Sequence, residues 1–141
     1  MKSTLIELAE VVFAADRYAT EATGITIAEV EPHRAVCRLR LEARHRNARG
    51  AVMGGVIFTM ADFGAAIAAN TDCLEVGGLQ WVSLGSTVNY LASPRGDELC
   101  SETVCVKHGR TTALYRTTVS DGARAVAEVS ATMVCVGGSD C

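Results

Sequence analysis

The sequence predicts an α+β fold in which an antiparallel sheet wraps around one long apolar helix. The segment from about residue 53 to 70 is apolar on almost every helical face, and a helix of this kind must be buried. Four strand-like runs follow it, and the short turns between them are typical of antiparallel neighbours. A curved sheet around the helix is the simplest structure that covers it.

The length of 141 residues predicts one domain over 1–141, with an N-terminal helix at about 4–22 and a core at about 25–136. Hydrophobic residues at 49% and charged residues at 21% are typical of a globular protein. The formal net charge of −3 and the 5% aromatic content argue against a nucleic-acid partner.

We expect a cytoplasmic protein with no membrane partner. Glu7, Glu10 and Asp16 interrupt the apolar run that a secretory signal requires, and the uncharged stretch 51–61 is too short to span a bilayer. The six cysteines include no C-x-x-C pair, and no histidine has metal-ligand spacing beside them. We therefore predict packing cysteines without disulfides in a reducing compartment, and no metal.

The first predicted element is the helix at 4–22. Thr4 and Glu7 fit a capping box, and apolar residues recur at helical spacing until Gly24, which is a suitable stop. A hairpin at 25–31 and 34–42 follows, and in its second strand apolar residues alternate with arginines, with Val36 as the exception. The later strands are predicted at about 79–92, 97–107, 111–120 and 124–136.

Asp62 is the one charged residue of the long helix. Burying an unpaired carboxylate costs several kcal/mol and raises its pKa, whereas a domain is stable by only about 5–15 kcal/mol. We interpret Asp62 as a nucleophile or general base. The alternative is that it caps or pairs with a group on the sheet.

Gly54 and Gly55 open this helix, where backbone N–H groups lack intrahelical partners and favour negative charge. Such amides suit either a developing oxyanion or a phosphate. Gly54 and Asp62 are eight residues apart, which is about 12 Å along a helix. If both act on one carbonyl, they come from different copies of the helix, in a site shared across a two-fold dimer.

The basic cluster, the tryptophan and the histidines have structural interpretations, and for the first two a binding role is the alternative. Basic side chains between residues 38 and 49 are interpreted as a solvated strand face and loop, or as a landing site for phosphates. Trp81 is interpreted as core or pocket wall. His33, His45 and His108 fall in turns or loops, where we expect solvated surface histidines.

The sequence carries the pattern Asn47-x-x-Gly50-x-x-Met53-Gly54-Gly55-x-x-Phe58-x-x-Ala61-Asp62, and later a strand ending Tyr90-Leu91-Ala92-Ser93-Pro94. This combination resembles the hotdog-fold acyl-CoA thioesterases of the phenylacetate-degradation (PaaI-like) group over about residues 20–136. The resemblance implies a six-stranded antiparallel sheet around the central helix, assembled as a homodimer or homotetramer, that hydrolyses an acyl-CoA without a cofactor.

The resemblance also implies roles for individual residues. Asp62 would attack the thioester carbonyl or activate water, and the amide of Gly54 or Gly55 would polarise that carbonyl. Asn47 would orient the carbonyl or the water, and Ser83 would position the water.

Further residues would contact the substrate. Met53 stands next to the reacting carbonyl, where the family usually has histidine, and Phe58 belongs to the same motif. CoA would run near the turn formed by Gly109, Arg110 and Thr111. Aryl-acetyl, benzoyl-like and medium-chain acyl groups stay open, and the alternative function is a non-catalytic module that binds acyl-CoA.

Overall fold

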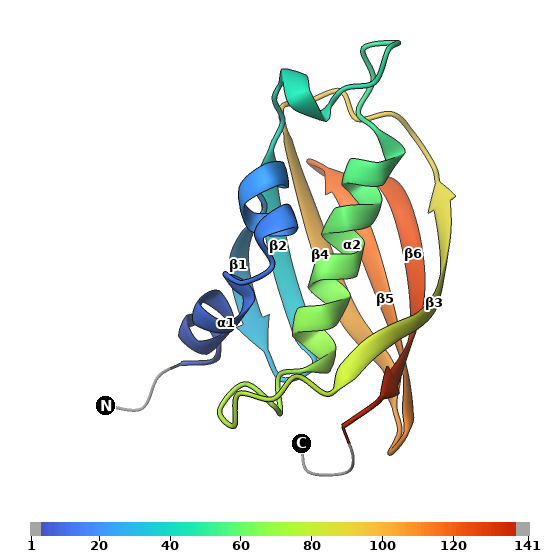
Figure 1. The fold of residues 1–141 in the computed structure, drawn as a ribbon. Helices are drawn as coiled ribbons and strands as arrows, with labels where there is room; N and C mark the ends of the chain where they lie inside the picture. The colour runs from blue at the N-terminus through green and yellow to red at the C-terminus, as the bar shows by residue number, and fades with distance from the viewer. Residues whose placement is uncertain (1–3, 138–141) are drawn as a thin grey trace.

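A computed structural model describes residues 4–137 of the chain, and in it a six-stranded antiparallel sheet curves around helix α2 (Figure 1). The strand order is β1-β2-β4-β5-β6-β3, so β1 and β3 are the two edges. This arrangement confirms the predicted fold class. The strands are β1 Thr26–Glu31, β2 Arg34–Arg40, β3 Trp81–Tyr90, β4 Glu98–His108, β5 Thr112–Asp121 and β6 Arg124–Cys135.

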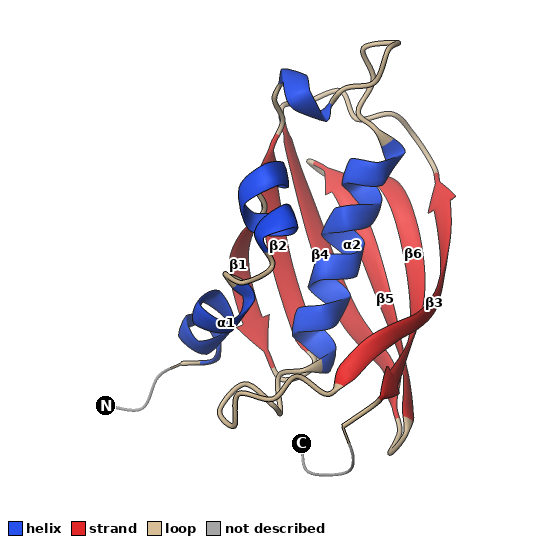
Figure 2. Cartoon of the chain, viewed as in Figure 1, coloured by secondary structure: helices blue, strands red, loops and turns tan. Residues whose placement is uncertain are grey.

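Helix α2, Gly54–Ala69, crosses the concave face of the sheet, and the other helical segments lie on the same side (Figure 2). Met60 and Ile67 of this helix are fully buried. Gly64 allows a close approach to the sheet, because a Cβ there would lie 2.6 Å from the Thr103 hydroxyl oxygen. No helix among the described residues is long and apolar enough to cross a membrane.

The prediction that α2 is buried on every side was wrong for one stripe of the helix. Along this stripe Gly55 and Asp62 are exposed, while Thr59 and Ala66 are half-buried. These positions are spaced by three or four residues and therefore share one face. Asp62 is consequently a surface carboxylate of this chain.

The predicted single N-terminal helix is two segments, α1 Leu5–Phe13 and the π-helix η1 Tyr18–Thr23. The break lets Phe13 and Ala19, which would point in different directions on one straight helix, both pack into the core at 2% and 6% exposure. The ends of the segment match the prediction. The Glu7 amide donates to the Thr4 hydroxyl at 3.3 Å, and Gly24 ends the π-helix with φ 91°.

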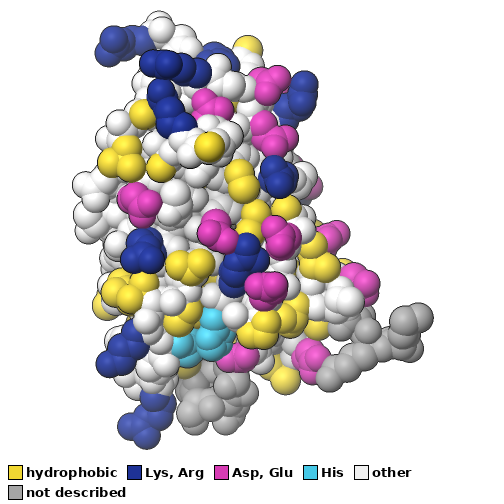
Figure 3. All heavy atoms as spheres, turned by 180° about the vertical axis from the view of Figure 1, so that it is seen from behind, with side chains coloured by type: hydrophobic (Ala, Val, Ile, Leu, Met, Phe, Trp, Pro, Cys, Tyr) yellow, Lys and Arg dark blue, Asp and Glu magenta, His cyan; other side chains and the backbone are white. Residues whose placement is uncertain are grey.

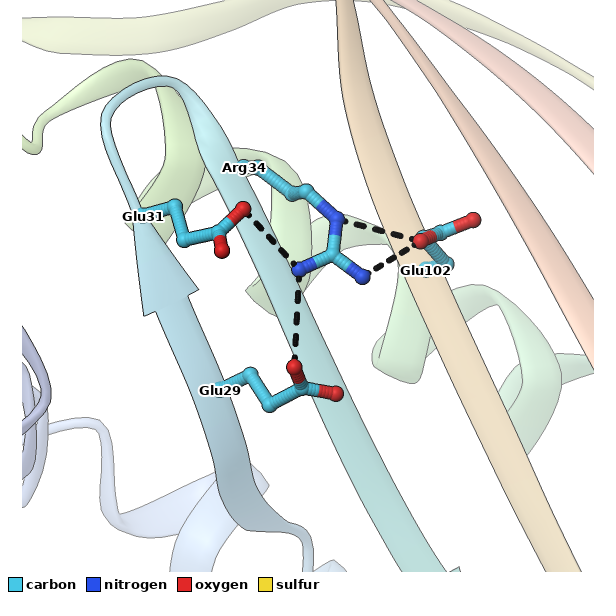
Figure 4. A network of polar contacts seen from close by, with 4 residues as sticks. All are labelled: Glu29, Glu31, Arg34 and Glu102. Atoms are coloured by element: carbon cyan, nitrogen blue, oxygen red, sulfur yellow. Dashed lines mark hydrogen bonds and ion pairs between the residues drawn. The ribbon is translucent and has the colours of Figure 1, made fainter.

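The outer face of the sheet is tied together by Arg34, which lies on β2 beside the β1–β2 turn (Figure 4). Its guanidinium contacts Glu102 of β4 at 2.6 Å and Glu31 and Glu29 of β1 at 3.3 and 3.7 Å. The hydrogen bond to Glu102 raises the pKa of Arg34. One side chain thus links three adjacent strands.

Two predictions about cysteine and histidine were wrong. Cys73 is buried and disulfide-bonded, although no disulfide was expected from the spacing. His45 is 2% exposed. Its Nε2 lies 2.7 Å from the Thr23 carbonyl, and its Nδ1 accepts from the Glu42 amide at 2.9 Å. Trp81 is 5% exposed and belongs to the core, as one of its two interpretations stated.

Candidate active site

The first turn of α2 presents free backbone donors. Met53 precedes the helix in an extended conformation and makes no side-chain cap. Within residues 4–137, no backbone acceptor outside the helix is found for the amides of Gly54 or Gly55. Tyr90, at the end of β3, donates its hydroxyl to the Gly54 carbonyl at 3.0 Å. The two amides can therefore bind an anionic oxygen.

Asn47 shapes the loop before the helix. Its side-chain carbonyl accepts from the amides of Arg49 and Ala51 at 2.9 and 3.1 Å. This leaves its side-chain NH₂ as a donor for an outside group. The loop borders a cavity of 540 Å³ next to the start of α2. The lining residues include Asn47, Arg49, Val52, Gly54, Ile57, Tyr90 and Ser93.

Asp62 and Ser83 lie together. The Ser83 hydroxyl on β3 donates to a carboxylate oxygen of Asp62 at 3.3 Å, and the same hydroxyl lies 3.5 Å from the Met133 sulfur. The sequence alternative that Asp62 pairs with a sheet residue is therefore observed. A carboxylate held by one hydroxyl and open to solvent is still able to accept a proton or to attack a carbonyl.

Asp16 is a neighbour of Asp62 that the sequence did not suggest. A hollow of 270 Å³ lies between the segment around η1 and the exposed stripe of α2, and both carboxylates line it. Partial burial and the charge of Asp62 raise the pKa of Asp16. Tyr18 and Phe63 also border the hollow. Asp16 and Asp62 are distant in the sequence, so no local pattern could connect them. The break after α1 brings them together in the fold.

The remaining predicted residues are divided between the two ends of α2. Met53 is 44% exposed at the helix start, and Phe58 is half-buried one turn later. The turn between β4 and β5, residues 109–111, lies at the other end of the sheet, past the C-terminus of α2 (Figure 1). One chain therefore does not bring the helix amides, Asp62 and Arg110 to one point.

Most of the basic cluster is paired with other groups. Arg38 contacts Glu98 at 3.0 Å, Arg40 lies 3.9 Å from Asp97, and Arg44 donates to the Ala22 carbonyl at 2.7 Å. Arg49 differs because it lines the cavity at the helix start. The interpretation as a solvated face fits Arg38, Arg40 and Arg44. Arg49 is the arginine that could still contact a phosphate.

Comparison with known proteins places this geometry among thioesterases. A model of the thioesterase superfamily matches residues 49–128. The chain is similar to acyl-coenzyme A thioesterase 13 of Mus musculus, with 25% identity over 114 residues that cover 80% of this chain and 79% of the relative.

Two solved structures are also similar. The PaaI protein of the E. coli phenylacetic acid degradation operon has a TM-score of 0.80 at 24% identity, covering 96% of this chain and 99% of that one. A Streptococcus mutans protein bound to acetyl CoA has a TM-score of 0.73 at 28% identity, covering 82% and 91%.

Proposed function

The chain belongs to the thioesterase superfamily and is a thioester hydrolase, and we propose that its substrate is an acyl-CoA, cleaved to the free acid and CoA. The observation that carries this proposal is the Asp62 carboxylate, hydrogen-bonded to Ser83 on the exposed stripe of a helix whose first amides are free. The named relatives support the substrate class, since one is an acyl-coenzyme A thioesterase and another was solved with acetyl CoA.

The proposed site is shared between two copies of the chain. Gly54 and Asp62 are separated by about 12 Å along α2, so one carbonyl cannot contact both within one protomer. The exposed stripe of α2 that contains Asp62 lies beside the exposed edge strand β3. A two-fold partner at this edge would place its Gly54 near Asp62 and would create two equal sites per dimer.

In the proposed reaction Asp62 takes a proton from water while the water oxygen adds to the thioester carbonyl carbon. The negative charge moves to the carbonyl oxygen, where the amides of Gly54 and Gly55 of the partner stabilise it, with a contribution on the order of 10²–10³ in rate per donor. Collapse breaks the C–S bond, and the CoA thiolate leaves and takes up a proton. Direct attack by Asp62, followed by hydrolysis of the anhydride, uses the same groups.

The remaining residues hold the substrate. The free NH₂ of Asn47 donates to the carbonyl or the water, and Ser83 orients the water against Asp62. Met53 contacts the reacting end, and Phe58 contributes to the acyl surface. We place the CoA phosphates against Arg49, which lines the 540 Å³ cavity, and against Arg110 in the turn at 109–111.

The test compares wild type with Asp62→Asn on a panel of aryl-acetyl, benzoyl and medium-chain acyl-CoAs, with release of the CoA thiol as the readout. We expect kcat/KM to fall at least about 100-fold with an unchanged Tm, because the amide keeps the volume but removes the base. Asp97→Asn is the matched control, since this carboxylate is 80% exposed directly before β4 and does not line the hollow beside Asp62.

Activity of Asp62→Asn within a few-fold of wild type would remove Asp62 from the mechanism. Binding of acyl-CoA by the wild-type protein without turnover of any member of the panel would instead support the non-catalytic binding module.

A further inference from the structure

Three side chains that can ligate a metal ion converge at the end of the sheet near the C-terminus of α2. They are His33 from the β1–β2 turn and Cys105 and His108 from β4, and their ligand atoms lie within 4.8 Å of one another. The two imidazoles are stacked, with ring centroids 4.2 Å apart and an angle of 13° between the planes. Histidine surface is visible as one patch near the end of the molecule in Figure 3.

Both histidines are oriented by a second group. His33 Nε2 lies 2.8 Å from a carboxylate oxygen of Asp72, and His108 Nδ1 lies 2.8 Å from the Tyr115 hydroxyl. If these nitrogens carry the protons, the other nitrogen of each ring has a free lone pair. Carboxylate and hydroxyl partners of this kind orient the histidines of metal sites.

The turn that carries His33 is held in place. His33 has φ 57°, a left-handed conformation that a residue other than glycine adopts infrequently. Its amide donates to the Thr71 hydroxyl at 2.9 Å, which fixes the turn to the end of α2. The adjacent Arg34 is anchored to Glu102 and Glu31 (Figure 4). The backbone of His33 is thus fixed, while its side chain, at 28% exposure, has room to turn.

We propose that His33, Cys105 and His108 form a binding site for a borderline-soft divalent metal ion of the zinc type. Imidazole nitrogen and cysteine sulfur are the ligands that Zn²⁺ prefers. Ligand atoms around one Zn²⁺ stand roughly 3.3–3.7 Å apart, given bond lengths of about 2.0–2.3 Å. The three groups therefore close by about 1 Å when an ion binds, and the His33 ring tilts out of the stack while its Nε2 stays against Asp72.

Binding is a proton-coupled step. A cysteine ligates a metal ion as the thiolate, so the Cys105 thiol releases its proton when the ion binds. Three protein ligands leave a fourth tetrahedral position for water. The cluster lies near the C-terminus of α2, past the helix end opposite to Gly54, so it is separate from the helix start and its cavity. The sequence pattern did not suggest the cluster, because His33 is 72 residues from Cys105 and only the fold brings it beside Cys105 and His108.

The test uses full-length protein stripped of metal with a chelator and kept reduced with a non-coordinating phosphine. Zn²⁺ is added in a calorimeter, and Co²⁺ is added as a spectroscopic probe of tetrahedral nitrogen and thiolate ligation. We expect one ion per chain, a thiolate-to-Co²⁺ charge-transfer band, and competition of Zn²⁺ against Co²⁺. Tm rises with Zn²⁺ because the ion binds the folded chain.

The variants are Cys105→Ser, His108→Asn and His33→Asn, the last chosen because asparagine tolerates a left-handed turn. Each is expected to lower Zn²⁺ affinity by more than 100-fold, and Cys105→Ser to abolish the charge-transfer band. Asp72→Asn is expected to lower affinity about 10–100-fold through the orientation of His33. Cys100→Ser, a free half-buried cysteine on the same strand, is the matched control and keeps full binding.

The unfolding transition of each metal-free variant establishes that it is folded. No stoichiometric binding by the wild type, or binding that the three ligand variants leave unchanged, would overturn the proposal. These readouts do not involve thioester hydrolysis, so the result is independent of the function proposed above.

Discussion

The two edge strands of the sheet, β1 and β3, differ in how well their unpaired backbone groups are protected. An edge strand has unpaired backbone N–H and C=O groups, which can pair with another chain. Strand β1 is covered by α1, whose Leu8 and Val12 pack against the same core as Ile27 and Val30 of the strand. Its outward residues include Glu29 and Glu31, and charges at an edge oppose pairing.

Strand β3 has neither protection. It is exposed at nearly every position after Trp81, on both faces. Val82, Leu84 and Tyr90 are 44%, 67% and 55% exposed, and the strand carries no charged residue. Large apolar side chains on an uncovered edge are typical of an interface. Strand β1 is therefore a protected edge and β3 an unprotected one, and in the dimer proposed above β3 is the edge that pairs with the second copy.

The largest expected effect comes from placing a charge on β3. Leu84→Glu puts a carboxylate in the middle of the apolar edge, where burial against a partner would be strongly unfavourable. We expect the assembly to become monomeric and acyl-CoA hydrolysis to fall at least about 100-fold, because each shared site loses one half. Light scattering after gel filtration and the thiol-release assay measure the two changes.

Thr26→Glu is the matched control, since it places the same charge at an exposed position of β1. It is expected to change neither assembly nor activity. A Leu84→Glu protein that is monomeric and fully active would show that one chain contains the whole site.

A smaller effect, on stability, is expected from the Arg34 contacts beside β1. Arg34→Met removes the contacts to Glu102, Glu31 and Glu29 while keeping the aliphatic stem. A partly buried network is worth more than an isolated surface pair, so we expect about 1 kcal/mol less stability and a Tm lower by about 3 °C, with unchanged activity. Chemical denaturation gives the free energy of unfolding.

Arg40→Met tests the specificity of that result. The contact of Arg40 with Asp97 is 3.9 Å long and both side chains are about four-fifths exposed, so stability should not change. Equal losses in both variants would mean that the Arg34 network adds nothing beyond general surface charge.

The smallest effect concerns the connection that follows β3. The Asp121 carboxylate accepts from the amides of Arg95 and Gly96 at 2.6 and 2.8 Å, and these hydrogen bonds lower its pKa from 3.8. A lowered folded pKa contributes stability above the unfolded pKa, and the contribution is lost as the pH falls through the folded value. Asp121→Asn should therefore reduce Tm slightly at pH 7.

The difference in Tm between wild type and Asp121→Asn should shrink as the pH falls below 3.8 and vanish once the folded carboxyl is protonated. A difference that stays constant over this range would mean that the charge of Asp121 does not support the turn.

The sequence alone determined the elements that depend on near neighbours. The Thr4 cap, the stop at Gly24, the first hairpin and the alternation of buried and exposed residues from Cys37 to Arg40 are each set within a few residues, and each is found in the structure. The same holds for α2, whose apolar composition predicted the sheet around it. The motif that runs through Asn47 to Asp62 predicted the thioesterase family for the same reason, since it is one continuous segment.

Tertiary structure decided what depends on distant segments meeting. Local patterns did not show the exposure of Asp62, the choice of Ser83 as its partner on the sheet or the approach of Asp16. Nor did they show the burial of His45 or the convergence of His33, Cys105 and His108. The free energy of such contacts arises from packing between elements, and the pattern within one element encodes which face is apolar but not which partner it meets.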